Sequence, residues 1–431
     1  MSKEENRKNF SKYVSQNILG MIGFSCYVLA DSYFISIAKG ADGLTALNLV
    51  MPLYSIIFSI GEMIGVGSAI RYAISKIKKD ADADDYFWNA LIWCILSSML
   101  FVFAGIFFSA DIMRVLGADE HIVAVGNNYT KIFMCFAPMF MCNYVTNAFV
   151  RNDVAPGIAM SATLFSSLFN IVFDYILMFP MNLGMEGAAL ATALSPIIGM
   201  GICSIHFFSK KSSVRLVVCK PSVRKLVAGS QLGVSAFVGE MSSAVITLAF
   251  NFVILKLAGN VGVAAYGVVA NIAIVTTAVF NGVAQGSQPL ISSCFGRGDK
   301  DGCTQLKRMG YTTAFVLAAV MYSILFIFAG QFVAVFNSEG SEMLRLYATE
   351  GVKLYFIGIF FAGINIVGGG AFSATEDAFK AAVVSVARGF VLILGAVFVM
   401  SALFGMTGVW LAYAVAEGIT TFIMLVMVLR V

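Results

Sequence analysis

Long stretches without a single charged residue constrain this chain more than any other feature of its sequence. The runs 86–110, 154–173, 309–338 and 389–416 contain no Asp, Glu, Lys or Arg, and each approaches or exceeds the roughly 20 residues that a helix needs to cross a bilayer. Hydrophobic residues make up 59% of the 431 positions and charged residues 12%, against about 45–50% and 25% in soluble globular proteins. We therefore predict an all-α, polytopic membrane protein.

Breaks at Gly, Pro, Asn and charged clusters divide the chain into twelve predicted transmembrane helices. The predicted spans are 13–37, 45–75, 87–110, 122–150, 155–180, 185–209, 227–257, 262–295, 305–332, 342–372, 377–402 and 406–429. An even number of spans places both ends of the chain on the same side of the membrane.

Basic residues predict the orientation of these spans, because Lys and Arg accumulate on the cytoplasmic side. One side carries the basic N-terminus, Arg151 and the stretches 71–79, 210–225 and 297–308. The opposite side holds mainly Lys39, Arg114, Lys256 and Arg345. Both termini and the middle loop are therefore predicted to be cytoplasmic. We interpret the basic middle loop as a solvated linker, in preference to a site for lipid or nucleic acid, and expect no nucleic-acid partner.

The sequence offers little for catalysis. Its eight cysteines fall singly and mostly within spans, which is typical of packing residues, and two histidines are too few for a metal centre. It has no nucleophile elbow, phosphate-cradling loop or zinc-binding helix motif. We expect neither an enzyme nor an ATP-driven pump, and no cofactor. The charged first dozen residues lead into a span too long for a signal peptide, so no cleavable one is expected.

The two halves of the chain repeat each other. The segment GMEGAALATA, which begins at Gly184, matches GMTGVWLAYA, which begins at Gly405, at six of ten positions. Nearly the same offset of 221 relates Gly61 and Gly65 to Gly282 and Gly286, Lys79-Asp80 to Lys300-Asp301, and Asn143 to Asn365. Since each unit holds six spans, both enter the membrane in the same orientation. We expect two six-helix lobes in a parallel repeat, at 1–209 and 227–431, joined by a linker at 210–226.

Several polar side chains share one depth in the first predicted lobe. At about 1.5 Å per helical residue, Asp31, Tyr129, Asp174 and Thr192 lie about 9–11 Å below the outer edge, and Asn170 lies one turn deeper. An ionisable side chain in a bilayer costs on the order of 3 kcal/mol unless it faces a partner or a wet cavity. We interpret this layer as a buried cation site.

Two cations suit such a layer. Paired carboxylates with neutral oxygens can coordinate Na⁺ as a hard cation. Two nearby acids in a low-dielectric site can instead share a proton. A third interpretation is structural: Asp31 and Asp174 would only hydrogen-bond across helices, or one of them would face a wet outer vestibule.

Short motifs occur along the chain in a specific order. They are Ala30-Asp31-Ser-Tyr-Phe-Ile-Ser36, Leu44-Thr-Ala-Leu-Asn48 with Pro52, Arg151-Asn-Asp153, Asn170-x-x-x-Asp174 and Gly184-x-x-Gly-Ala-Ala-Leu-Ala-Thr192. Together they resemble the multidrug and toxic compound extrusion (MATE) family, in its bacterial multidrug-efflux type. The resemblance implies that Asp31, Asn170, Asp174 and Thr192 bind the coupling ion, as ligands if it is Na⁺, with Tyr129 and Asn147 nearby.

The second predicted lobe departs from the family pattern. Some members carry an acid in span seven, matched here by Glu240, and another in span ten, where this chain has Asn365. Glu240, Arg388 and Glu417 fall near the predicted midplane. Either Arg388 bridges one or both acids, or Glu240 binds cationic cargo directly. We place Glu240, Asn365, Arg388 and Glu417 in a central substrate cavity.

These features predict a transporter. The 38 Phe, 15 Tyr and 22 Met mostly face lipid or pack, but a few of them beside acids would accept amphipathic organic cations. We expect a monomer in the lipid of the cell membrane that exports such cations in exchange for Na⁺ or H⁺ by alternating access. The alternative is a lipid or lipid-linked saccharide flippase on a related two-lobed scaffold, which would favour a cationic cavity.

Overall fold

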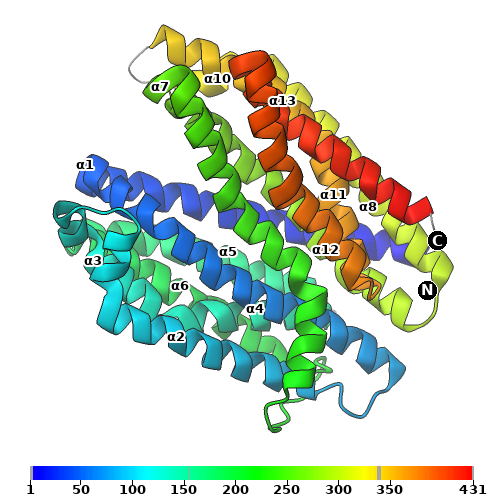
Figure 1. Cartoon of the computed structure of the whole chain (residues 1–431). Coiled ribbons are helices and arrows are strands. Elements are labelled where there is room, and N and C mark those ends of the chain that lie inside the picture. Colours follow the sequence, from blue (N-terminus) through cyan, green and yellow to red (C-terminus); the bar gives the residue numbers. More distant parts are fainter. Residues whose placement is uncertain (1–2, 154, 337–340, 430–431) are drawn as a thin grey trace.

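The computed structural model describes residues 3–153, 155–336 and 341–429, and in these ranges the regular elements are helices without strands (Figure 1). The first half contains α1 (Lys3–Lys78), α2 (Asp85–Val115), α3 (Glu120–Cys135), α4 (Ala137–Asn152), α5 (Pro156–Met178) and α6 (Gly184–Phe207). The second half contains α7 (Val223–Gly296), α8 (Lys300–Ile327), α9 (Ala329–Phe336), α10 (Glu342–Tyr355), α11 (Ile359–Ala374), α12 (Ala378–Val386) and α13 (Leu392–Leu429). A 3₁₀ turn (Phe356–Gly358) precedes α11, and a π-helical segment (Ala387–Val391) precedes α13.

Three of these long helices are each two helices joined at a glycine. The backbone leaves helical geometry at Gly40 (φ 57°) in α1, at Gly259 (φ 61°) in α7 and at Gly405 (φ 58°) in α13. This left-handed conformation strains any residue with a Cβ atom, so glycine is the residue that suits these turns. Gly184 (φ 52°) starts α6 in the same conformation. Gly40 and Gly259 turn the first hairpin of each half, and Gly184 and Gly405 precede the last helix of each half.

The helices account for the twelve predicted spans. Among the described residues nine helices are long and apolar enough to cross a membrane, or ten when α3 and α4 count as one span bent by 46°. Two of them, Val223–Gly296 and Ala378–Leu429, contain two spans each, because they are broken at Gly259 and Gly405. The bend between α3 and α4 lies at Phe136, before a proline in the first turn of α4, where the sequence analysis expected one continuous helix over 122–150.

The two largest hydrophobic cores among the described residues lie mainly in the two halves. One includes Tyr72, Tyr129 and Phe133, and the other includes Phe250 and Trp410. In Figure 1 the helices α2 to α6 form one bundle and α8 to α13 the other, with both ends of the chain at the same end of the molecule.

The beginning of α1 belongs to both lobes. Phe10, Tyr13 and Val14 are part of the second core, whereas the later residue Ile35 is part of the first. The first helix therefore contributes side chains to both cores.

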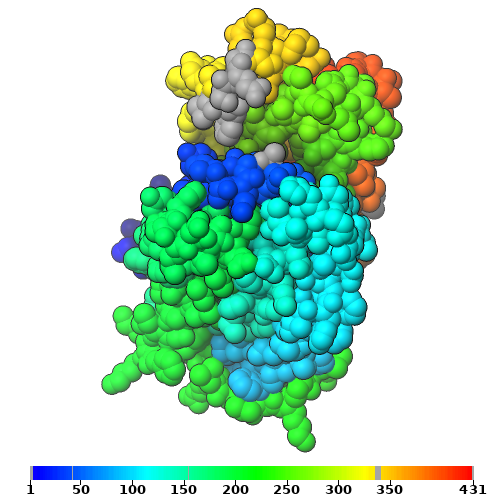
Figure 2. Space-filling model, turned by 90° about the vertical axis from the view of Figure 1, so that its left-hand side faces the viewer, coloured from blue at the N-terminus to red at the C-terminus, as the bar shows by residue number. Residues whose placement is uncertain are grey.

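The lobes touch closely at the end that carries the chain termini. A Cβ atom on Gly67 of α1 would lie 2.1 Å from the carbonyl oxygen of Gly229 of α7, and one on Gly233 would lie 1.9 Å from that of Met63. Helices can come this close only where small residues such as Gly67, Gly229 and Gly233 let the backbones approach. An ion pair of Arg71 with Glu376 adds to this contact. Figure 2 shows the opposite end, where the two halves form distinct masses.

The middle loop is mostly exposed, and it is attached to the first lobe at Ser212, Ser213 and Val214. Asp153 Oδ2 accepts hydrogen bonds from the backbone N–H of Ser213 (2.9 Å) and from Ser212 Oγ (3.1 Å), and His206 Nε2 lies 2.8 Å from the same oxygen. Val214 is buried. The loop is held in place because a buried carboxylate needs donors, and the loop supplies them.

Candidate functional site

Five polar residues from four helices form a buried cluster in the first lobe. Asp31 lies on the first segment of α1, Tyr129 on α3, Asn170 and Asp174 on α5, and Thr192 on α6. Each is at most 6% exposed. Asn170 and Asp174 lie on one face of α5, because four residues make about one helical turn. The structure thus brings together all the residues of the predicted depth layer.

The contacts within this cluster are few. Asn170 Nδ2 donates to Thr192 Oγ1 at 3.2 Å. The carboxylates of Asp31 and Asp174 are close enough to interact electrostatically. The hydroxyl of Tyr129 pairs with that of Tyr54 on α1, a residue that the sequence analysis missed because tyrosines are common among packing residues.

Several oxygen atoms of the cluster lack a donor. Within the described chain, Asp31 Oδ1, Asn170 Oδ1 and both carboxylate oxygens of Asp174 are buried without a hydrogen-bond partner. An unsatisfied buried acceptor costs about 1–3 kcal/mol, and more when it is charged. A cation placed among these oxygens would offset that cost. The hydrogen bonds across helices that the structural interpretation requires are therefore missing at Asp174.

The donor set is consistent with Na⁺ or a proton. It consists of two carboxylates and neutral oxygens, which suits a hard cation. The described residues contain no group of three or more His, Cys, Asp or Glu side chains that could hold a metal ion.

Asn147 lies apart from this cluster. Its Nδ2 donates to the carbonyl oxygen of Ala159 at 3.1 Å and to Thr163 Oγ1 at 3.2 Å. It lines the central cavity instead. The resemblance to the family placed it near Asp31, but its position close to the end of α4 separates the two.

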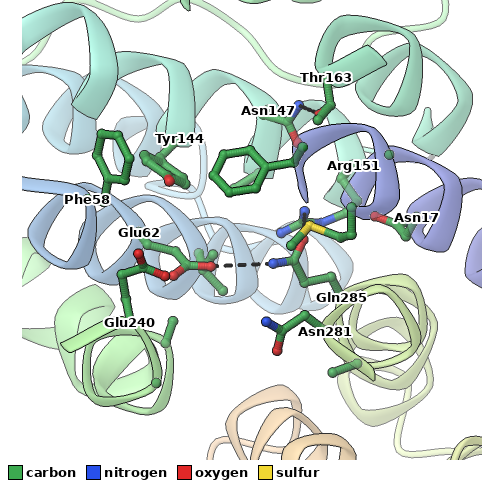
Figure 3. A pocket seen from close by; sticks show the side chains of 18 of the residues that line it. Asn17, Phe58, Glu62, Tyr144, Asn147, Arg151, Thr163, Glu240, Asn281 and Gln285 are labelled. Carbon is green, nitrogen blue, oxygen red and sulfur yellow. Dashed lines mark hydrogen bonds between the residues drawn. The ribbon is translucent and has the colours of Figure 1, made fainter. Parts of the chain in front are cut away.

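A central cavity lies between the two lobes, with about 1760 Å³ of empty space that includes open solvent. Both lobes contribute lining residues, and those that matter for charge are Glu62, Arg151, Glu240 and Arg388. Figure 3 shows Glu62 and Glu240 with their carboxylates directed toward one another, from α1 and α7.

A polar network connects the lobes at this cavity. Arg151 of α4 donates to Gln285 Oε1 of α7 at 2.6 Å, and Gln285 Nε2 lies 3.4 Å from Glu62 Oε1. Arg151, counted among the basic residues of the cytoplasmic side, is only 5% exposed. Glu62 was not predicted, although a carboxylate within the predicted span 45–75 was the same signal that identified Asp174.

The second lobe contains a neutralised charge pair. Arg388 contacts Glu417 Oε1 through Nε at 3.0 Å and through one terminal nitrogen at 2.7 Å. Asn365 Nδ2 donates to Glu417 Oε2 at 2.7 Å. Arg388 therefore bridges Glu417, and no ion pair among the described residues joins it to Glu240. Arg388 lies in the π-helical segment, a local irregularity that often occurs at functional sites.

Known proteins resemble this chain along nearly its whole length. The family profile named MatE matches residues 17–176 and 236–399, once in each half. The multidrug export protein MepA of Staphylococcus aureus is 27% identical over 414 residues, which cover 93% of this chain and 89% of MepA.

Solved structures show the same fold. A transporter of the MOP superfamily from Pyrococcus furiosus, described as having a binding pocket of reversed polarity, superposes with a TM-score of 0.90 at 19% identity, over 98% of this chain and 95% of the other. An outward-facing multidrug resistance MATE transporter superposes with a TM-score of 0.89 at 20% identity, over 99% and 96%. The profile match in both halves and the shared fold lead to one conclusion: this chain is a transporter of the MatE family, whose motifs its sequence resembles.

Proposed function

We propose that this protein exports amphipathic organic cations across the cell membrane in exchange for Na⁺ or H⁺. The observation that carries the proposal is the separation of two sites. The unsatisfied carboxylates of Asp31 and Asp174 lie within one lobe, whereas the larger cavity is shared by both lobes. One site suits a small cation and the other an organic one.

Exchange requires that the two sites bias the same movement. Two lobes that rock against each other expose the shared cavity alternately to each side of the membrane. A cation that binds the first-lobe cluster better in one arrangement than in the other shifts the population between them. The ion then changes the affinity of the protein for cargo through that shift, without direct contact between ion and cargo.

Relatives support the export of drugs. MepA, which is similar over 93% of this chain, is described as a multidrug export protein. The cavity has the composition that such cargo needs, with Phe24, Phe58 and Tyr144 beside acidic residues. Aromatic faces attract organic cations by about 0.5–2 kcal/mol each.

The flippase alternative is not favoured by the charges of the cavity. A phosphate-bearing lipid would need free cationic side chains, but Glu417 neutralises Arg388. Arg151 is the other cation in the described lining, and Glu62 and Glu240 lie in the same cavity.

The proposal includes a topology. Lobes at 1–209 and 227–431 would be joined by the cytoplasmic linker at 210–226, with both termini cytoplasmic. The protein would act as a monomer surrounded by lipid, and would need no cofactor beyond the coupling ion.

Purified protein in proteoliposomes tests this function. We expect a sodium gradient alone or a proton gradient alone to drive ethidium against its own concentration gradient. Accumulation should collapse when the gradient is dissipated by a matching ionophore. Transport that is indifferent to both gradients would contradict the antiporter.

A further inference from the structure

The charges that line the central cavity do not balance. Among the described residues the charged lining consists of Glu62, Arg151, Glu240 and Arg388. Arg388 is paired with Glu417, which lies behind it. One arginine then remains for two glutamates, so the cavity has one carboxylate more than it has arginines to pair with.

The two glutamates form a pair across the lobe interface. Glu62 belongs to α1 and Glu240 to α7, their carboxylates are directed toward each other (Figure 3), and they interact electrostatically. Neither takes part in an ion pair within the described chain. Glu62 accepts only the long 3.4 Å contact from Gln285, so both carboxylates have oxygens available to a ligand.

A second observation indicates a ligand in the same cavity. Gln288 lines it, is 6% exposed, and its Oε1 has no hydrogen-bond partner in the described chain. Asn281, Gln285 and Gln288 are spaced by four and three residues, so they lie on one face of α7. This face therefore presents to the cavity a buried acceptor that the protein itself does not satisfy.

We propose that Glu62 and Glu240 together bind the charged head of cargo that carries N–H groups, such as a protonated amine, an amidine or a guanidine. The aromatic body of the cargo would pack on Phe58 and Tyr144, whose rings lie 5.6 Å apart beside Glu62. This inference rests on the proposed export function, since it defines the chemical class of cargo for that cavity.

The preference for N–H groups follows from what the carboxylates lack. A planar amidinium directs parallel N–H donors at carboxylate oxygens and forms charge-assisted hydrogen bonds. A quaternary ammonium neutralises charge but has no donor, so the desolvated oxygens stay unsatisfied. Because the two acids come from different lobes, movement of the lobes would separate them and release the head.

Two small aromatic cations of similar size test this preference. Benzamidine has an amidinium head, and phenyltrimethylammonium has a quaternary head. Binding of each to the whole protein in lipid nanodiscs can be measured by calorimetry. We expect wild type to favour benzamidine by about tenfold or more, the equivalent of one charge-assisted hydrogen bond.

Single substitutions test whether Glu62 and Glu240 cause the preference for the amidinium head. Glu62→Gln and Glu240→Gln should each reduce the affinity ratio of the two probes to about twofold or less. The exposed Glu342→Gln on α10 should leave the ratio unchanged. Retained binding of phenyltrimethylammonium shows that a variant is folded.

Two results would overturn the proposal. One is equal affinity of wild type for both probes, which needs no variant. The other is a Glu62→Gln protein that keeps the full preference. Ion-driven ethidium transport is measured separately, so a selective protein that does not couple transport to an ion would refute the export function and leave the two-acid site standing.

Discussion

Unsatisfied oxygens at individual residues connect this structure to transport most directly. Both carboxylate oxygens of Asp174 are buried without a donor, and Asp31 lies close enough to repel them. A folded protein retains such a pair at a cost of several kcal/mol per buried charge. In the proposed function this cost is offset when a Na⁺ ion or a proton binds, so the residues that destabilise the empty site would also make it responsive to the cation.

The first prediction concerns Asp174. Asp174→Asn keeps the size of the side chain but removes the charge that the coupling cation would neutralise. In wild type the cargo dissociation constant should change by about 5- to 150-fold with Na⁺ or with pH, the usual range of coupling free energies. In the variant the change should be less than about twofold, as measured by equilibrium binding of ethidium.

A control separates this effect from a general loss of negative charge. Asp111→Asn removes an exposed carboxylate that pairs with Arg114 at the end of α2, and it should keep the response of wild type. If Asp174→Asn also keeps it, the first-lobe cluster is not the coupling site.

The second prediction concerns the pair of Arg388 and Glu417. Arg388→Met leaves a buried carboxylate without its partner, which costs about 3–5 kcal/mol. The thermal unfolding midpoint in detergent should therefore fall. Adding Glu417→Gln removes the unpaired charge and keeps an acceptor for Asn365, so the double variant should recover most of the loss. A double variant less stable than Arg388→Met would show that the unpaired charge of Glu417 does not cause the loss of stability.

At the scale of helices, the arrangement depends on where glycine occurs. Gly40, Gly259 and Gly405 turn the chain at φ near 60°, and Gly67 and Gly233 allow α1 and α7 to touch backbone to backbone. The first group sets where helices end. The second group sets how closely the lobes meet at the end that carries the termini.

The third prediction tests this close contact. Gly67→Ala places a Cβ atom 2.1 Å from a carbonyl oxygen of α7, so it should disfavour the observed arrangement by about 1–3 kcal/mol. Spin labels at Asp80→Cys and Lys300→Cys, in a background without the native cysteines, should report longer and broader distances. Gly239→Ala, whose Cβ meets nothing within 4 Å, is the matched control. An unchanged distance distribution in Gly67→Ala would contradict the role of this contact between α1 and α7.

The fourth prediction concerns the middle loop. Asp153→Ala removes the acceptor of several hydrogen bonds from His206 and the loop, each worth about 1 kcal/mol. Trypsin should then cleave after Lys210, Lys211 or Arg215 about tenfold faster than in wild type. The exposed Asp301→Asn on α8 should not change the rate. Equal cleavage in all three proteins would mean that the loop is held by its apolar contacts alone.

Much of the element pattern could be predicted from the sequence. Charge-free runs located the spans because a bilayer excludes charge, and depth along each helix brought Asp31 and Asp174 together. Depth says nothing about which neighbours a side chain faces, so the burial of Arg151 between the lobes could not be predicted in this way. Asn147 was grouped with Asp31 only by the resemblance to the family. The depth argument could also have identified Glu62, which is a carboxylate within the predicted span 45–75.

At the scale of the whole molecule, duplication of a six-helix unit explains the fold, and divergence of the two copies explains why their charged residues differ. The family profile matches once in each half, and the glycine turns recur at equivalent positions. The halves have nevertheless diverged in charge. The first lobe keeps two unpaired acids, whereas the second has Asn365 and a closed Arg388–Glu417 pair. In the proposed function, ion coupling would therefore belong to one lobe and cargo binding to the interface.

Exchange of cargo for a cation can be measured most directly by running it in reverse. Proteoliposomes are loaded with ethidium in the absence of any ion gradient. As ethidium leaves, the uptake of radioactive Na⁺ and the internal pH are followed. We predict that the cargo gradient drives one of these cations inward, so that a gradient of this cation builds up, and that Asp174→Asn abolishes this movement. Ethidium that leaves while both Na⁺ and pH stay unchanged would contradict exchange.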